Sequence, residues 1–528
     1  MSRAAGNAAF KAGEFEAAAN AYAAAIEELR NGGLASEVAI CLSNKAAALL
    51  KLRRFENALS DVEAACAALN YAGESEQLVP LQAKLRIRKG EALSGLQRHE
   101  AALVAFQEAL SFDPRNAFAA TGIAQEEIAL FYQPAVRSSP VEVRLIDAAH
   151  GRGLFARARI NEGDVLFRER PILCLQHRAS ASRTRCCTHC LRYTGSLEEQ
   201  MRAAVGPDSP ATRLGHPECA ISGSAPIECP SCSAVFCCPA CRDEAQAYHA
   251  LLCSREKTGA CGTAIRSLEP ALKAALQHFL TTAEAPFLLA ARILAVIVSR
   301  LANGTPFDVA ARPFSLLCHR PWTSIIRAQF EGSRAGPPVA LAEQPWYREW
   351  SGYRDMVAEA SRVLGDVFQA QCPALPQHVL TAEYFDELVG AVALNSTAVG
   401  VFHPFETYLE RVGMVRGSDC AVAEQKKYGD LLAQHGGIPR AEGIGIFLIH
   451  STINHSCAPN AEHAIYRNEP AHQQAVVNLV ALRRIEKDDQ ITISYLSDEE
   501  AAAETPERRK MLQDDYGFVC DCSKCTRA

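Results

Sequence analysis

Four closely spaced pairs of cysteine and histidine gather in one stretch of the chain and are suited to bind metal. The 528-residue chain holds 21 cysteines, and ten of them lie between Cys186 and Cys253. Eight soft ligands are enough for two tetrahedral zinc ions, and because no coordination position stays open, both ions would be structural. The candidate ligands are Cys187, Cys190, Cys229, Cys232, Cys237, Cys241, His249 and Cys253.

Spacing alone leaves Cys186 in competition with Cys187, and it favours Cys238 over Cys237 as the partner of Cys241. A gap of 38 residues also separates Cys190 from Cys229. Ordinary buried thiols are the alternative to a metal site, but buried thiols have no reason to recur in four close pairs. The cysteines that remain as substitute ligands are Cys186, Cys219 and Cys238.

A polar turn between two apolar runs is the second candidate for chemistry. Residues 454–460 read Asn-His-Ser-Cys-Ala-Pro-Asn and lie between strand-like runs at 444–449 and 474–482. The Pro-Asn step alone would make a turn. Buried Asn454 and His455 need hydrogen-bond partners as well, and a polar ligand would supply them.

Composition and charge exclude several classes of protein. The apolar fraction of 48% and the charged fraction of 22% are ordinary for a globular protein, and the net charge of −6 argues against nucleic-acid binding through phosphate neutralisation. The first residues lack the layout of a signal peptide, and the most apolar run, at 287–298, is shorter than the about 20 residues that cross a bilayer. We therefore expect no membrane, a cytoplasmic and/or nuclear protein, and reduced thiols.

Three similar motifs predict helical hairpins in the N-terminal part. They begin at Phe15, Phe55 and His99, 40 and 44 residues apart, and an apolar helix follows each. The pattern resembles tetratricopeptide repeats, so we expect an α-solenoid of three repeats over residues 1–118 and a linker helix at 119–139. Small residues expected where helices cross are Gly13, Ala18, Ala58, Gly90 and Ala102.

The repeats are similar to those of co-chaperones. In that subfamily, cations and asparagines on the concave face hold the C-terminal carboxylates of heat-shock chaperone tails, a task that suits converging cations and amides. Solvated surface residues of a scaffold domain are the alternative interpretation. The matching positions are Arg3, Asn7, Asn44, Lys84 and Arg88.

Short strands follow the repeats and return in the C-terminal part, and the middle of the chain reads as helical. The pattern predicts strands at 141–145 and 165–167, with a tight glycine-rich turn and another strand within 151–156 between them, and later strands at 474–482 and 490–496. Helices are expected at 271–280, 287–301, 353–368 and 382–388. The charged, glycine-rich segment 411–443 is expected to be a loop, and its position makes it a candidate for substrate contact.

Together these motifs resemble SET-domain lysine methyltransferases of the SET-and-MYND type. The likeness runs from Val141 to Cys525 and rests on Arg-Gly-Leu-Phe, Asn-His-Ser-Cys-x-Pro-Asn, Ile-Ser-Tyr and Cys-x-Cys-x2-Cys, which are specific only jointly. It implies a multidomain α+β chain in which a MYND zinc finger and a helical insert split a β-rich SET domain. The implied domains after the repeats and linker are 140–185 (SET, first part), 186–253 (finger), 254–390 (insert), 391–500 (SET core) and 501–528 (post-SET).

The resemblance also assigns roles to residues. In MYND fingers the first and third pairs share one ion and the second and fourth share the other, and the aromatic-Cys-x3-Cys step selects Cys237. Cys457 would complete a third zinc site with the post-SET cysteines Cys520, Cys522 and Cys525, so about three structural ions are expected. The residues implied to bind S-adenosylmethionine are Arg152, Gly153, Leu154, Asn395, Asn454, His455, Tyr495 and Phe518.

The implied reaction is methyl transfer from S-adenosylmethionine to a lysine of histone or non-histone proteins. Displacement at a sulfonium carbon needs a neutral amine, and an apolar channel lowers the lysine pKa from its usual value near 10.4. Tyr495 would orient the reacting groups, and Tyr516 and Phe518 would form the channel wall beside it. The alternative is a catalytically silent adaptor that binds partner proteins through its repeats and finger.

Overall fold

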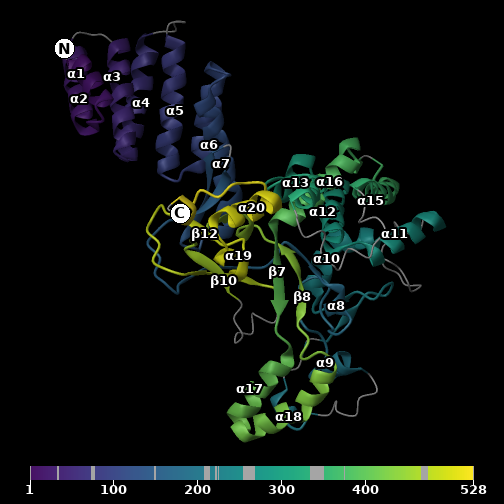
Figure 1. Cartoon of the computed structure of the whole chain (residues 1–528). Helices are drawn as coiled ribbons and strands as arrows, with labels where there is room; N and C mark the ends of the chain where they lie inside the picture. Colours follow the sequence, from purple (N-terminus) through teal and green to yellow (C-terminus); the bar gives the residue numbers. More distant parts are fainter. Residues whose placement is uncertain are drawn as a thin grey trace. The chain divides into compact units, whose positions relative to one another are not determined.

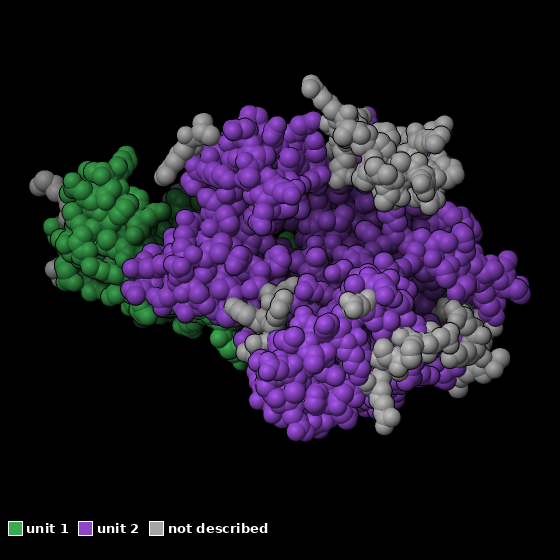
Figure 2. All heavy atoms as spheres, turned by 60° about the horizontal axis from the view of Figure 1, so that its bottom comes forward, with its two compact units in different colours: residues 1–158 green, residues 159–528 purple. Residues whose placement is uncertain are grey.

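The computed structural model describes residues 2–31, 35–72, 78–147, 150–206, 214–220, 223, 225–253, 268–332, 350–373, 375–464 and 474–526. The chain divides into two compact units, residues 1–158 and 159–528 (Figure 2). Each unit has a hydrophobic core of its own.

Helical hairpins build most of the first unit, as predicted. Consecutive helices pack side by side in three pairs (Figure 1). A longer helix follows, and it leads into one antiparallel pair of strands. The elements are α1 (Ser2–Lys11), α2 (Phe15–Asn31), α3 (Ala35–Lys51), α4 (Phe55–Ala72), α5 (Val79–Gly95), α6 (His99–Phe112), α7 (Ala117–Val136), β1 (Val141–Asp147) and β2 (Gly151–Ala156).

Small side chains allow the helices of the first unit to approach closely. Ala18, Ala58 and Ala102 are fully buried, and a Cβ at Gly90 would lie 2.7 Å from the Phe106 ring. The prediction for Gly13 was wrong. Its φ of +80° places it in the turn after α1, where a Cβ would meet nothing within 4 Å, so this glycine serves the turn and not a helix crossing.

Three small sheets and one parallel pair of strands form the β-structure of the second unit. The sheet orders are β10-β11-β3, β4-β8-β7 and β5-β6, all antiparallel, and β9 runs parallel to β12. The strands are β3 (Val165–Glu169), β4 (Leu173–Gln176), β5 (Ile227–Glu228), β6 (Val235–Phe236), β7 (Ser396–Val401), β8 (Ala441–Ile446), β9 (Asn454–His455), β10 (Ala461–Ala464), β11 (Val477–Ala481) and β12 (Gln490–Ile493).

Helices supply the largest core of the second unit, and the four predicted helices of the middle region are confirmed. α13 and α14 were missed. The helices are α8 (Arg178–Ala181), α9 (Leu197–Val205), α10 (Pro239–Leu252), α11 (Pro270–Thr282), α12 (Ala285–Ala302), α13 (Phe307–Ser315), α14 (Trp322–Gly332), α15 (Trp350–Gln371), α16 (Ala382–Asn395), α17 (Pro404–Arg416), α18 (Ser418–Gln434), α19 (Asp498–Ala502), α20 (Thr505–Tyr516) and α21 (Ser523–Thr526).

The apolar helix α12 lies at the centre of this core. Phe287 packs edge-on against Trp322 at 4.9 Å and against Phe385 at 6.0 Å between ring centroids. At 18 residues the helix is longer than the predicted run at 287–298, and by length and composition alone it could cross a membrane. One such helix is weak evidence, and its apolar side chains are buried in the core of the second unit.

The prediction of a loop at 411–443 was wrong, because α17 and α18 occupy most of it. Buried Tyr408, Val412, Tyr428 and Leu432 recur at helical spacing and pack against α9. The three helices α9, α17 and α18 form what we call the accessory module, which Figure 1 shows at the far end of β7 and β8. Two long insertions, one inside the finger region and one between β7 and β8, thus share one core.

Candidate active site

The polar turn singled out in the sequence begins with β9 and leads to β10. One turn of 3-10 helix, His450–Thr452, precedes Asn454 and His455. The carboxylate of Glu169, at the end of β3, accepts hydrogen bonds from the backbone N–H groups of Ile449 and His450, both at 2.8 Å. Glu169 therefore fixes the backbone that leads into the Asn-His pair.

The Glu169 carboxyl makes stability depend on pH. Burial raises its pKa from 4.5 to about 7, although the backbone hydrogen bonds oppose this shift. Its contribution to stability is therefore fully present below pH 4.5 and is lost as the pH rises through about 7. Between pH 5 and pH 8 this group should lower the free energy of unfolding by about 1–2 kcal/mol, after allowance for partial exposure.

Denaturant unfolding at several pH values measures this effect. The Glu169→Gln variant should show a flatter dependence on pH than the wild type, whatever its absolute stability. Glu462→Gln changes an exposed glutamate on β10 and is the matched control. Equal slopes for the wild type and Glu169→Gln would rule out Glu169 as the titrating group.

His455 connects the turn to the segment that follows β12 and to a group of cysteines. Its Nδ1 accepts the N–H of Tyr495 at 2.9 Å, and its Nε2 lies 3.2 Å from Sγ of Cys457. Burial, with a smaller effect from the positive charge of Arg508, lowers the His455 pKa to about 4. The ring is therefore neutral at pH 7 and carries its proton on Nε2, toward Cys457.

Aromatic rings gather beside His455. The ring centroids of Tyr495 and Tyr516 are 4.8 Å apart, and the Phe518 centroid lies 6.4 Å from each of them and 6.0 Å from that of His455. The Tyr495 hydroxyl donates to the Ile453 carbonyl oxygen at 2.6 Å, which fixes the ring. All three predicted channel residues thus lie together, and we call Tyr495, Tyr516 and Phe518 the aromatic wall.

Four cysteines form a cluster that packs against this wall. Sγ of Cys457 lies 3.9 Å from that of Cys520 and 3.6 Å from that of Cys525. A zinc ion with Zn–S bonds of about 2.3 Å places its tetrahedral ligands about 3.8 Å apart, so these distances fit. Arg509, on α20, donates to the Cys520 carbonyl at 2.9 Å and ties the cluster to the helix that ends at Tyr516. The cluster is Cys457, Cys520, Cys522 and Cys525.

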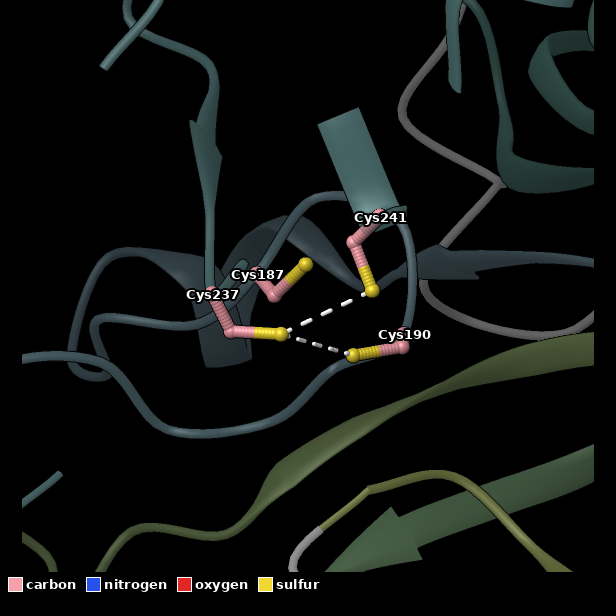
Figure 3. Close-up of side chains that lie close together, drawn as sticks. All are labelled: Cys187, Cys190, Cys237 and Cys241. Carbon is pink, nitrogen blue, oxygen red and sulfur yellow. Dashed lines mark hydrogen bonds between the residues drawn. The ribbon is translucent and has the colours of Figure 1, made fainter. Parts of the chain in front are cut away.

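The helix α10 supplies the last ligand of the first finger cluster. Figure 3 shows its four sulfur atoms converging, with Sγ of Cys237 at 3.5 Å from that of Cys190 and 3.6 Å from that of Cys241. Cys237 follows β6, and Cys241 lies in the first turn of α10. The cluster is Cys187, Cys190, Cys237 and Cys241.

The second finger cluster contains the histidine. Nε2 of His249 lies 3.3 Å from Sγ of Cys229 and 3.7 Å from that of Cys232, and Cys253 lies 3.9 Å from Cys229. The structure thus groups the first pair with the third and the second with the fourth, as the family resemblance implies. The cluster is Cys229, Cys232, His249 and Cys253.

The substitute ligands lie outside these clusters. Cys238 is the N-cap of α10, where its Sγ accepts the N–H of Cys241 at 3.5 Å. Cys186 lies in a small core with Tyr193, and Cys219 lies in the core of the accessory module. Each of these three cysteines belongs to a helix cap or a core, a role that the spacing did not reveal.

The side-chain amide of Asn395 forms hydrogen bonds with backbone groups of the protein. At the end of α16 its Oδ1 accepts the N–H of Cys318 at 3.1 Å, and its Nδ2 donates to the carbonyl oxygens of Cys318 at 2.9 Å and Ala391 at 2.7 Å. Contact of this side chain with the cofactor stays a prediction, and in the structure its amide holds the loop before α14. No local pattern could reveal this, because Cys318 is 77 residues away.

The Arg-Gly-Leu motif lies in the first unit. Arg152, Gly153 and Leu154 belong to β2, and Gly153 stands opposite Arg144 of β1. Leu154 is fully buried. Contact of these three residues with a cofactor stays a prediction.

The five positions that match the carboxylate-binding residues of co-chaperone repeats are called the clamp here. Three of them line a cavity of about 220 Å³ in the first unit. Arg88 donates to Ser43, and the Tyr22 hydroxyl donates to Asn7 at 2.8 Å. Among the described residues, Arg3 pairs with Glu37 instead, and neither Arg3 nor the exposed Lys84 lines the cavity. Lys11 was missed, although it follows Asn7 by four positions on α1. The lining is Asn7, Phe10, Lys11, Tyr22, Asn44, Ala47 and Arg88.

The family model of the SET domain matches residues 151–496 of the sequence, which is more than half of the chain. The match includes the polar turn, β12 and both finger clusters. The chain therefore belongs to the SET domain family. Its mixed α+β architecture, with a helical N-terminal region and clusters of zinc-type ligands, agrees with the predicted fold class.

Named relatives place the chain more closely within this family. The human protein-lysine N-trimethyltransferase SMYD5 is 29% identical over 406 residues, which cover 73% of this chain and 86% of the relative. The Arabidopsis thaliana histone-lysine N-methyltransferase ATXR2 is 24% identical and covers 71% and 88%, respectively. The solved tetratricopeptide domain of Arabidopsis OM64 is 30% identical over 23% of this chain and 88% of that structure, with a TM-score of 0.19 that supports no further argument.

These findings identify the activity. The chain is a protein-lysine methyltransferase of the SET-and-MYND type that uses S-adenosylmethionine, as the sequence motifs predicted. Its three cysteine and histidine clusters are suited to zinc. The relatives give no support to the catalytically silent adaptor.

Proposed function

We propose that the Asn454–His455 turn holds S-adenosylmethionine and that the aromatic wall receives the target lysine. The convergence of Tyr495, Tyr516 and Phe518 beside His455, whose Nδ1 accepts the N–H of Tyr495, carries this proposal.

The aromatic wall prepares the lysine for transfer. S-adenosylmethionine supplies a methyl group on a positively charged sulfur. The apolar faces of Tyr516 and Phe518 disfavour the ammonium form of the lysine and so lower its pKa. Tyr495, held through the carbonyl of Ile453, orients the amine toward the methyl carbon, and no acid–base pair is needed beyond this alignment.

We assign structural zinc to all three clusters. Each offers four protein ligands, so no coordination position is left for chemistry. The two finger ions would stabilise a region with little secondary structure of its own, and the third would attach the post-SET segment to the polar turn.

The proposed product is trimethyllysine in histone or non-histone proteins. The names of the relatives, a protein-lysine N-trimethyltransferase and a histone-lysine N-methyltransferase, support this substrate class. Incubation with labelled S-adenosylmethionine, histones and a cell lysate, followed by mass spectrometry, tests it. Monomethyllysine alone at long reaction times would contradict the trimethyl assignment.

A second proposal concerns the cavity of the first unit, which we assign to the C-terminal carboxylate of a chaperone tail. Arg88 and Lys11 supply positive charge, and Asn7 and Asn44 supply amides. Burial lowers the pKa of Arg88, so an anionic partner would be favourable there.

Arg88→Ala should weaken binding of an acidic chaperone-tail peptide by about tenfold or more, the size expected for a lost hydrogen bond to a charged group. Titration calorimetry with the full chain measures the affinity. Lys84→Ala, which changes an exposed lysine on the same helix, should have little effect. The peptide with an amidated C-terminus should bind weakly to both the wild type and the variant, and equal binding of the two peptides to the wild type would reject the clamp.

A further inference from the structure

The loop between α13 and α14, residues 316–321, is fixed against α16 at two points. Asn395 binds the backbone N–H and carbonyl of Cys318, as described above. One turn or more earlier on α16, Gly390 lies so close to the loop that a Cβ would collide with the carbonyl oxygen of Arg320. The loop therefore holds Arg320 in one place relative to α16.

The side chain of Arg320 reaches the aromatic wall. A Cβ built at Gly517 would lie 3.1 Å from Nη1 of Arg320, and Gly517 is the residue between Tyr516 and Phe518. Its φ of +81° ends α20 in the left-handed conformation and lets the chain pass this close to the guanidinium.

The guanidinium of Arg320 is only partly satisfied. Nη2 donates to the Ser324 carbonyl oxygen in a long hydrogen bond of 3.4 Å. Nη1 is buried and finds no hydrogen-bond partner within the part of the chain that the structure describes. A buried charged donor without a partner is costly, which indicates that an anionic group occupies this place in the working enzyme.

S-adenosylmethionine has one anionic group, the carboxylate of its methionine part. A planar guanidinium offers two parallel donors that match a carboxylate. We propose that Arg320 binds this carboxylate, and that Asn395 and Gly390 are positioning residues that hold Arg320 for the purpose. The proposal rests on the cofactor site proposed at His455 and Phe518, and it adds recognition of the amino-acid end of the ligand.

A pair of ligands separates this contact from the rest of the cofactor site. S-adenosylhomocysteine retains the carboxylate, whereas methylthioadenosine retains the adenosine and thioether but lacks the amino-acid part. If Arg320 contacts the carboxylate, its loss should weaken only the first ligand. Uniform weakening is expected instead if Arg320 merely supports the fold.

Calorimetric titration of the purified full chain tests the proposal. Arg320→Gln should weaken S-adenosylhomocysteine by about tenfold to a hundredfold, the size of a lost charged hydrogen bond, and change methylthioadenosine by less than about twofold. Arg320→Lys should recover part of the affinity for S-adenosylhomocysteine. Arg354→Gln, an exposed arginine on α15, is the matched control and should bind both ligands as the wild type does.

The outcomes also separate this proposal from the proposed cofactor site. Equal weakening of both ligands by Arg320→Gln, or no weakening of either, would overturn the role of Arg320. His455→Ala should weaken both ligands. If His455→Ala leaves both affinities unchanged, the cofactor site itself is misplaced, whatever Arg320→Gln does.

Discussion

Replacing Cys457 by serine should abolish lysine methylation and lower the zinc content from about three ions per chain to about two. Cys457 is the one ligand of its cluster that lies on the polar turn, and the other three follow α20. Without it, the segment that carries Tyr516 and Phe518 loses its attachment beside His455. We expect a loss of at least about a hundredfold in turnover, because small misplacement of an aligning group is that costly. Metal analysis and label transfer measure both quantities.

Cys420→Ser is the control for this substitution. Cys420 is a half-buried cysteine of the accessory module and lies outside the three clusters. Its variant should keep about three zinc ions and wild-type turnover. Full activity in a Cys457→Ser protein that holds only two zinc ions would show that the third cluster is not needed to form the lysine channel.

Tyr495→Phe should lower kcat by about a hundredfold or more and change the affinity for S-adenosylhomocysteine by less than about threefold. The substitution removes the hydroxyl that donates to Ile453, but it keeps the ring against His455 and Tyr516. The substitution should therefore impair the alignment of the amine and leave cofactor binding intact. A hundredfold decrease in kcat corresponds to about 2.7 kcal/mol of lost transition-state stabilisation. Single-turnover methylation and calorimetry separate the two constants.

Tyr384→Phe removes a hydroxyl from a half-buried tyrosine on α16 and should change neither constant. The thermal unfolding midpoint of Tyr495→Phe must stay close to that of the wild type for the comparison to hold. Wild-type kcat in Tyr495→Phe would mean that the aromatic wall positions the lysine without this hydroxyl.

Residues close together in sequence were the predictable part of the metal centres. The spacing of Cys187 and Cys190, or of Cys229 and Cys232, forces both sulfurs to one side of a tight turn, so the pairs could be read directly. The choice of Cys237 over Cys238 needed the family pattern. The structure supplies the reason, since Cys238 is turned toward the N-terminus of α10 and caps it.

Contacts that depend on distant packing could not be predicted. The partner of Asn395, Cys318, belongs to a loop that the sequence did not mark. The segment 411–443 reads as a loop because glycine and charge dominate it. Its apolar residues lie on one narrow helical face. That face is covered by α9, which belongs to another insertion. Long-range burial, unlike ligand spacing, leaves little trace in local sequence.

One crystallographic measurement tests most directly the claim that metal, cofactor and lysine channel meet at the polar turn. Crystals grown with S-adenosylhomocysteine should show three anomalous peaks at the zinc edge, each about 2.3 Å from its sulfur ligands. The ligand should lie against Asn454 and His455, with its sulfur facing the aromatic wall. Two peaks with Cys457 unligated, or the ligand bound away from His455, would contradict the account.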